Sequence, residues 1–379
     1  MVNRNVYLDY NASAPLRPEA QDAMLEGLSM IGNASSVHNY GRRMRKVLEE
    51  ARSNIKVSLG AKASTLIFTS GGTESNNLAL SAFPDKKVFA CSTSHASVLS
   101  AREDMTLLRV DSSGIVDIDF LGEMLRKAQN EGASVLLSVT LANSETGVVQ
   151  PLEKIVACAK SYGALIHCDA AQAIGRIPFD FDLSHIDLLS FSSHKVGGPV
   201  GIGALIVRKG LDPQPMIKGG GQEYGKRAGS SNIAAAMGFA AALKVSAPEE
   251  WSSVARKRER LEADLNQLGG QIIAKNVARL PNTCAVRLPD FLAETQLMVL
   301  DLDGFAVSAG SACSSGKVGA SHVLQAMGMS DDSAKETIRI SLCLDTSESD
   351  IENFIKSWHG LASKKRDQTR SSQLKASKL

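Results

Sequence analysis

The sequence contains no apolar run long enough to span a membrane, so a membrane-embedded protein is not expected. Its net charge of only +2, from 42 basic and 40 acidic residues, gives no support for direct binding of nucleic acid. The six cysteines include no Cys-x-x-Cys pair and no Cys/His cluster with zinc spacing, so we expect no metal site. The Gly-x-Gly-x-x-Gly pattern of dinucleotide-binding enzymes is also absent. With 44% hydrophobic and 22% charged residues, the composition is that of an ordinary globular enzyme.

The two ends of the chain bear on its location. The stretch at 7–10, Tyr-Leu-Asp-Tyr, has the pattern of folded structure rather than of a signal peptide, so we expect a cytoplasmic protein. The final Ser377-Lys-Leu379 matches a peroxisomal address and leaves that compartment open as a minor alternative. Residues 364–379 carry six lysines and arginines against one aspartate, and this Ser-, Lys- and Gln-rich tail is predicted to be disordered. A solvated tail and a docking segment both remain open.

At 379 residues, the chain suits one large domain and one smaller domain. Apolar, β-prone runs alternate with helical patterns over more than half the length, which predicts an α/β fold with a mostly parallel sheet covered on both faces. In such sheets, ligands bind at the carboxyl ends of the strands. The expected strands are 66–69, 87–91, 134–139, 164–167, 188–191 and 202–207, and the expected helices are 74–83, 96–104 and 152–162.

The pattern changes after Val245. Pro248 opens a charged amphipathic helix predicted to end near Leu268, and short strands and helices follow, as in a small α+β domain. These strands are expected at 283–288 and 337–342, and the helices at 294–302, 321–327 and 347–358. The first dozen residues, extended and apolar, are expected to pack with this region. The predicted division is a large ligand-binding domain at 16–245, a small domain made of 1–15 plus 246–362, and the basic tail at 363–379.

Lys195 lies in Ser190-Phe-Ser-Ser-His-Lys-Val-Gly-Gly-Pro199, a short distance after Asp169 in His167-Cys-Asp-Ala-Ala-Gln172. A lysine among small polar residues at a strand end is suited to be a Schiff-base amine. A carboxylate at a strand end is suited to pair with a protonated pyridine nitrogen. Together they suggest a pyridoxal cofactor that acts as an electron sink in amino-acid chemistry. Local sequence leaves open that Lys195 is a surface lysine in a turn and that Asp169 only caps a helix.

Two further candidate binding motifs lie where predicted strands end and helices begin. The turn Thr69-Ser-Gly-Gly-Thr-Glu-Ser75 joins a strand to a helix, and its glycines would let a phosphate approach the free N–H groups of the helix. A simple helix cap is an equally good interpretation of this turn. His95 begins the next predicted helix, where an imidazole can stack on a planar ring, although a lone histidine is more often structural.

Cys313 differs from the other cysteines in its setting. It lies among small residues in Ser308-Ala-Gly-Ser-Ala-Cys-Ser-Ser-Gly316, which suits an accessible nucleophilic thiol. Cys91, Cys168 and Cys284 lie within or beside strand-like runs and fit buried, inert positions. Arg339, in Thr337-Ile-Arg-Ile-Ser341, can direct a guanidinium fork at a substrate carboxylate.

The order of these motifs resembles that of the cysteine desulfurases, the NifS/IscS-type branch of the class V aminotransferase family. The resemblance extends from the N-terminus to about Gly360 and leaves only the tail uncovered. The matching stretches are 7–12, 32–38, 69–75, 143–150, 167–172, 190–203, 219–223, 308–314 and 337–342.

The resemblance implies a fold-type I enzyme dependent on pyridoxal 5'-phosphate, with Lys195 as the lysine that carries the cofactor and Asp169 as the partner of its ring nitrogen. His95 would stack on the ring and help to move protons, and Gln172 would hydrogen-bond the phenolic oxygen. The implied phosphate ligands are Gly72, Thr73, Ser192 and His194, and Ser230 would reach the cofactor of the neighbouring subunit in a homodimer. Arg339 and Asn11 are the implied substrate-binding residues.

The implied reaction converts L-cysteine to L-alanine and transfers sulfur to Cys313 as a persulfide, with Lys195 taking the Cα proton. Sulfur would then pass to an acceptor such as an iron–sulfur scaffold protein or a tRNA-thiolation relay. No metal, membrane or direct nucleic-acid partner is implied.

The chain departs from the family pattern at three positions. Ser144 replaces the asparagine expected near the phenolic oxygen, and Tyr224 and Leu344 replace arginines. These departures bear on substrate affinity and rate more than on reaction type. They leave open a selenocysteine lyase, an amino-group transfer, or a cofactor-bound scaffold or regulator of low activity, although simple transamination would not need Cys313.

Overall fold

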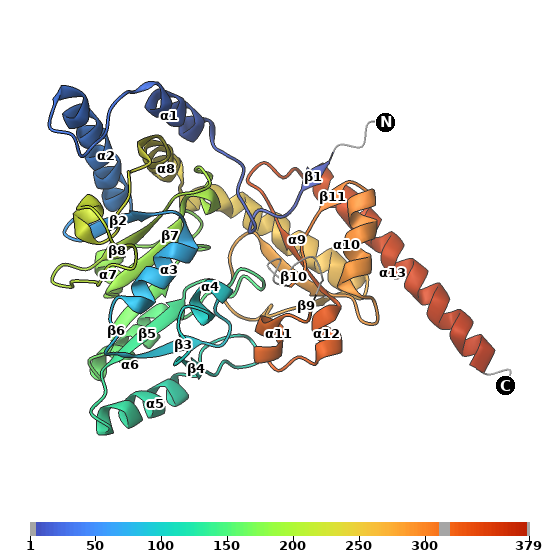
Figure 1. The fold of residues 1–379 in the computed structure, drawn as a ribbon. Helices are drawn as coiled ribbons and strands as arrows, with labels where there is room; N and C mark the ends of the chain where they lie inside the picture. The colour runs from blue at the N-terminus through green and yellow to red at the C-terminus, as the bar shows by residue number, and fades with distance from the viewer. Residues whose placement is uncertain (1–4, 311–318, 377–379) are drawn as a thin grey trace.

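The computed structural model describes residues 5–310 and 319–376, with side chains through residue 363. Within this part, a seven-stranded sheet forms the centre of the larger half of the molecule, with strand order β2-β8-β7-β6-β5-β3-β4 (Figure 1). Only β8 runs against its neighbours, so the sheet is mostly parallel, as predicted. The strands are β2 Thr65–Thr69, β3 Lys87–Cys91, β4 Thr106–Leu108, β5 Val135–Thr140, β6 Leu165–Asp169, β7 Leu188–Ser192 and β8 Gly203–Val207.

The central strands are buried on both faces, because helices cover both faces of the sheet. On β5, Leu137 and Val139 join one hydrophobic cluster while Leu136 joins another, which is the alternation that a pleated strand requires. The first cluster is covered by α1 Pro18–Ser29, α2 Asn39–Ser58, α5 Ile118–Asn130, α6 Leu152–Ser161 and α8 Ile233–Val245, and the second by α3 Gly72–Ser81 and α4 Ala96–Leu99.

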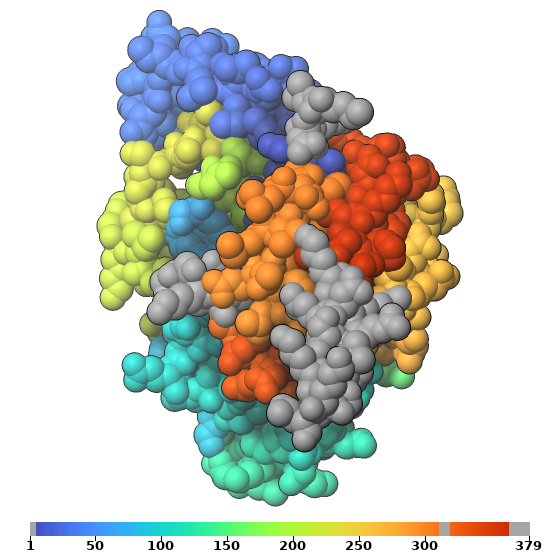
Figure 2. All heavy atoms as spheres, turned by 90° about the vertical axis from the view of Figure 1, so that its right-hand side faces the viewer, coloured from blue at the N-terminus to red at the C-terminus, as the bar shows by residue number. Residues whose placement is uncertain are grey.

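A separate hydrophobic cluster organises the C-terminal part of the chain, where a three-stranded sheet has the order β12-β10-β9. Leu8 and Tyr10 from the N-terminal segment belong to this cluster, and β1 Val6–Tyr7 pairs with β11 Phe305–Ala306. Figure 2 shows this side, with α10 beside the start of α13. The other elements are β9 Gln271–Ile272, β10 Thr283–Arg287, β12 Thr337–Ser341, α9 Ser252–Gln267, α10 Ala293–Leu302, α11 His322–Ala326, α12 Asp331–Lys335 and α13 Glu348–Ala376.

Two predicted elements differ from the structure. The helix expected at 96–104 ends at Leu99, because the Arg102 side chain turns to Asp104 and to the carbonyls of Phe83 and Lys86. The prediction of disorder from residue 363 is wrong over 363–376, where α13 continues and projects away from the body (Figure 1). This segment contains no proline or glycine, and lysine, arginine and glutamine, which favour helix, make up half of it. None of the described helices is long and apolar enough to cross a membrane.

His167 is a fully buried histidine in the middle of the sheet, held between the hydroxyls of Ser138 and Ser190 at 2.9 and 2.8 Å. Burial lowers its pKa from 6.5 to about 4. As the pH falls below 6.5, this histidine becomes protonated in the unfolded chain but stays neutral in the folded chain until the pH nears 4, so acid favours the unfolded state.

We therefore expect this residue to lower the free energy of unfolding by about 2 kcal/mol between pH 7 and about pH 5. Urea unfolding of the wild type and of His167→Asn at both pH values measures this. The variant should have a lower free energy of unfolding than the wild type at pH 7. Its free energy of unfolding should fall less than that of the wild type between pH 7 and pH 5. An equal loss in both proteins would contradict the assignment.

Candidate active site

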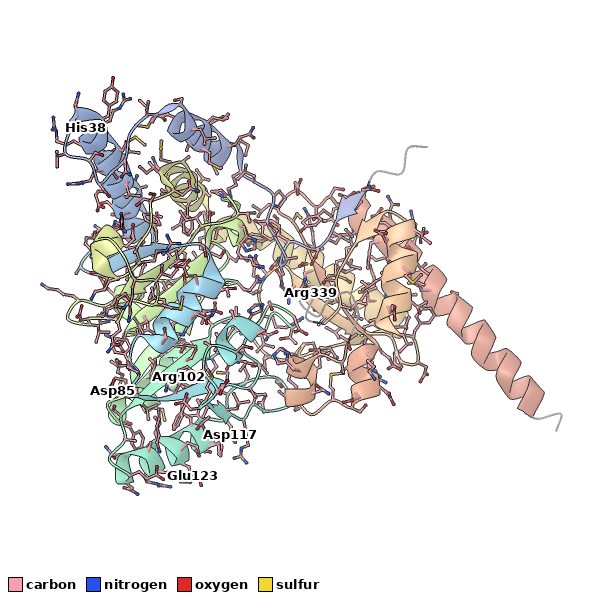
Figure 3. The ribbon with its side chains drawn as sticks, viewed as in Figure 1. His38, Asp85, Arg102, Asp117, Glu123 and Arg339 are labelled. Carbon is pink, nitrogen blue, oxygen red and sulfur yellow. The ribbon has the colours of Figure 1, made fainter. Side chains whose placement is uncertain are left out.

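A cavity of about 350 Å³ opens where β5, β6 and β7 reach their carboxyl ends, a volume that suits a small cofactor with its substrate. Both parts of the molecule line it. Asp169, Ser192 and Lys195 come from the ends of sheet strands, whereas Arg339 comes from β12 and occupies the junction between the two halves (Figure 3). The predicted residues that line this cavity are Asn11, Gly72, Thr73, His95, Ser144, Asp169, Gln172, Ser192, His194, Lys195 and Arg339.

Lys195 ends a short 3-10 turn, Ser193–Lys195, directly after β7. Its Nζ donates to the main-chain oxygens of Asn11 at 2.5 Å and Ala12 at 2.8 Å. Desolvation, followed by the positive charges of Arg176 and Arg339, lowers its pKa from 10.5 to about 7, against the opposing effect of Asp9 and Asp169. A large share of this side chain is therefore an uncharged amine at neutral pH, as a nucleophile and base requires.

Asp169 is the last residue of β6 and is almost completely buried. Its two oxygens accept hydrogen bonds from the Asn76 Nδ2 at 2.9 Å and from the main-chain N–H of Ala171 at 3.0 Å. It therefore stabilises the turn after β6 while also facing the cavity; it does not cap a helix, because turn residues, and no helix, follow β6 directly. No lysine, arginine or histidine of the described residues forms an ion pair with it, so its charge is available to a protonated ring nitrogen.

The part of the cavity lined by the start of α3 has the features of a phosphate site. α3 begins at Gly72, so the free N–H groups of its first turn face the cavity. The buried Ser192 Oγ has no hydrogen-bond partner among the described residues, so it can serve a ligand oxygen. A Cβ at Gly203 would lie 2.6 Å from the Gly71 carbonyl carbon, so the close approach of β8 to this turn requires glycine. Desolvation lowers the pKa of His194 to about 4, which keeps it neutral.

His95 stands at the N-terminus of α4 and also lines the cavity. Its Nδ1 accepts a hydrogen bond from the Ser97 N–H at 3.1 Å, which places the proton of the neutral ring on Nε2. Its pKa is lowered, mainly by desolvation, so the ring is neutral at pH 7 and is suited to stacking and to proton transfer.

Arg339 and Asn11 hold the wall made by the Ser144 loop. The Arg339 Nη2 lies 2.6 Å from the Asp9 carboxylate, and its Nη1 donates to the Ser144 carbonyl at 3.1 Å. The Asn11 Nδ2 donates to the same carbonyl at 3.0 Å. The buried Arg339 Nε has no partner among the described residues and remains free to donate to a ligand.

Of the other two predicted site residues, one falls beyond the part of the chain that the structure describes and one lies apart from this group. Cys313 is outside the described residues. Ser230 is exposed and lines a different cavity, beside Glu223 and Arg227. Two ion pairs fix the segment that precedes Ser230. Glu223 pairs with Arg52 at 2.6 Å, and Arg227 pairs at 2.9 Å with Glu74, which lies in the first turn of α3. Tyr224, one of the three departures from the family pattern, has its ring 5.2 Å from the Arg52 guanidinium.

The sequence reasoning did not identify three residues that the structure places at the site. Asn76 lines the cavity one helical turn after Gly72, a spacing that helical periodicity could have revealed. His322 also lines it, and its Nε2 bonds the Ser94 carbonyl at 3.0 Å. Arg176 lies behind Gln172, bonding its Oε1 at 2.7 Å. His322 has no local signal, because Ser94 is 228 residues away, whereas the four-residue spacing of Arg176 from Gln172 is a signal that the sequence reasoning did not use.

Comparison with known proteins agrees with this arrangement. Residues 6–354 match the family Aminotransferase class-V. The chain is 38% identical over 369 residues to the cysteine desulfurase IscS of Dictyoglomus turgidum, covering 92% of each protein, and 39% identical over 368 residues to a cysteine desulfurase of Cereibacter sphaeroides, covering 93% of this chain and 94% of that protein. The solved NifS-like protein of Rickettsia africae superposes with a TM-score of 0.88 at 33% identity, covering 95% of this chain and all of that one.

Proposed function

The chain belongs to the class V aminotransferase family, within it to the cysteine desulfurases, and on this premise we propose that it transfers the sulfur of L-cysteine to Cys313. The observation that carries the proposal is the pairing of a lysine of pKa about 7 with an aspartate free of ion-pair partners among the described residues, in one cavity. A solved relative, SspA, 32% identical with a TM-score of 0.78, is described in complex with cysteine.

Pyridoxal 5'-phosphate fits the residues of this cavity. Lys195 would carry it and Asp169 would pair with its ring nitrogen. The α3 N-terminus, the unpaired Ser192 Oγ and His194 would hold its phosphate, and the neutral His95 ring would cover its face. When bound, the cofactor withdraws electrons from the substrate's α carbon. Ser144 and Gln172 would contact its phenolic oxygen, and Asn11 would take part in binding the substrate.

The chain's own residues then supply binding, proton transfer and sulfur capture. The free Nε of Arg339 lies in the wall where a substrate carboxylate would bind. The Lys195 amine, a large share of which is uncharged at neutral pH, would accept the Cα proton. The Cys313 thiol would take the sulfur, so that L-cysteine and a thiol give L-alanine and a persulfide, with every atom balanced.

We propose a homodimer in which Ser230 completes the cofactor site of the partner subunit. Exposed apolar side chains lie on α1, on α2 and on the loop between them, and we propose that they face a second copy: Leu25, Leu28, Ile31, Val37 and Tyr40. Residues 34–35 of this loop line the same cavity as residues 221–224, in the segment that leads to Ser230. A second copy covering these side chains would bring Ser230 toward the neighbouring site.

The remaining proposals concern organisation and location. Two hydrophobic clusters support a large domain at 16–245 and a small domain at 1–15 plus 246–362. The five described cysteines are all free, in keeping with a reducing cytoplasm. The sulfur acceptor would be a protein such as an iron–sulfur scaffold, reached from Cys313.

The test is alanine release from L-cysteine by the protein loaded with pyridoxal phosphate, in the presence of a reductant. Cys313→Ala should lose nearly all alanine formation, whereas Cys158→Ala, which removes a partly exposed thiol on α6, should not. Equal alanine release by wild type and Cys313→Ala would overturn the proposed sulfur transfer. No alanine from any protein, with the cofactor bound, would favour a cofactor-bound scaffold instead.

A further inference from the structure

Arg176 is a guanidinium buried directly behind the candidate active site. Its side chain is 2% exposed, and no described aspartate or glutamate forms an ion pair with it. A buried charge without a carboxylate is rare, because desolvation makes it unfavourable unless other groups compensate. The position therefore calls for an explanation beyond packing.

The partners of Arg176 are oxygens of residues already assigned to the site. Its Nη1 donates to the Gln172 Oε1 and to the Asn11 Oδ1, both at 2.7 Å. Its Nη2 donates to the main-chain oxygen of Lys195 at 3.3 Å. One guanidinium thus connects the turn after β6, the N-terminal segment and the turn that carries the reactive lysine.

Two aromatic rings fix the position of this guanidinium. Its central carbon lies 5.0 Å from the Tyr10 ring and 5.8 Å from the Trp251 ring, within cation–π range. The two rings pack edge to face, and the Trp251 Nε1 donates to the Gly175 carbonyl at 2.7 Å. The positive charge therefore stays in one place.

The first consequence concerns the amide of Gln172. A guanidinium can only donate, so its partner on Gln172 must be the amide oxygen. The Nε2 must then point the other way, where it donates to the Asn11 carbonyl at 3.0 Å in a residue that lines the cavity. Arg176 thereby presents Gln172 to the site as a donor, which suits an anionic oxygen of a ligand.

The second consequence concerns Lys195. After desolvation, Arg176 is the largest influence on the pKa of this amine, and it lowers it. The charged and titratable groups around the amine are Arg176 in the turn after β6, Arg339 on β12, Asp9 in the N-terminal segment, Asp169 on β6, His95 at α4 and His194 beside it.

We propose that Arg176 is a positioning residue that orients Gln172 as a donor to the phenolic oxygen of the cofactor and keeps the Lys195 side chain an uncharged amine. The inference rests on the proposed function for the identity of the cofactor. It assigns a role to a residue that contacts neither cofactor nor substrate.

The test measures how fast the cofactor-free protein captures pyridoxal phosphate on Lys195, followed by absorbance across a pH series. In Arg176→Met the midpoint of this pH dependence should rise by about one pH unit, a tenfold smaller share of free amine at a given pH. Arg208→Met is the matched control, because Arg208 also lies over a ring, 4.7 Å from Phe181, and donates to carbonyls far from the site. Its midpoint should not move.

A second variant covers the case in which Arg176→Met does not fold. Arg176→Lys keeps the charge but not the planar fork, so its midpoint should stay near that of the wild type while cofactor affinity falls about tenfold. Adding Gln172→Ala to Arg176→Lys should weaken binding no further than Gln172→Ala alone. An unchanged midpoint in folded Arg176→Met, or additive losses in the double variant, would overturn the inference. A wild type that captures no cofactor would overturn the proposed function instead.

Discussion

Lys195→Ala is expected to lower the rate of alanine formation by about a thousandfold or more. The substitution removes both the amine that would carry the cofactor and the base that would take the Cα proton. No described lysine other than Lys195 lines the cavity, so no neighbour can replace it. Alanine formation is measured by amino-acid analysis. Covalent attachment of the cofactor is measured by the mass of the intact chain after borohydride reduction.

Lys87→Ala is the matched control for this experiment. Lys87 begins β3 and forms an exposed ion pair with Glu131, so its loss should change stability little. Its activity should equal that of the wild type, and so should the increase in mass that the reduced, attached cofactor gives. A cofactor that stays covalently attached to Lys195→Ala would place the reactive amine elsewhere and contradict the assignment.

The reactive groups could be predicted from sequence because they occupy the ends of parallel strands. Strand β7 begins with an apolar run, is buried on both faces and is followed at once by small polar residues, so Lys195 was expected at the carboxyl edge of the sheet. Asp169 is the last residue of β6, which runs parallel to β7, so it was expected at the same edge of the sheet. The sheet, the long helix α9 and the strands β10 and β12 were confirmed on similar grounds.

The support for these groups could not be predicted, because it comes from distant segments. The Lys195 amine donates to the carbonyl of Asn11, which is 184 residues away in the sequence. Arg176 donates to the Asn11 side chain, which is 165 residues away. No local pattern encodes such contacts. The length of α13 was missed for a different reason, since composition predicted disorder while the helix propensity of each residue favoured a continued helix.

Asp169→Asn tests the electrostatic role of the carboxylate with almost no change of shape. We expect activity to fall by about a hundredfold to ten-thousandfold, because an amide cannot stabilise a protonated ring nitrogen as a carboxylate does. Asp180→Asn, at the N-cap of α7 Phe181–Ser184, is the control, since asparagine caps a helix about as well as aspartate. Steady-state rates of alanine formation measure both.

A cofactor analogue separates charge from structure in this variant. Pyridoxal phosphate methylated on the ring nitrogen keeps a positive charge that does not depend on a proton, so it should restore part of the activity of Asp169→Asn. If the substitution acted instead by breaking the hydrogen bonds of residue 169 to Asn76 and Ala171, the methylated cofactor would not restore activity, because those bonds do not involve the cofactor. Equal rates with both cofactors in the variant would mean that Asp169 acts mainly by holding the turn after β6.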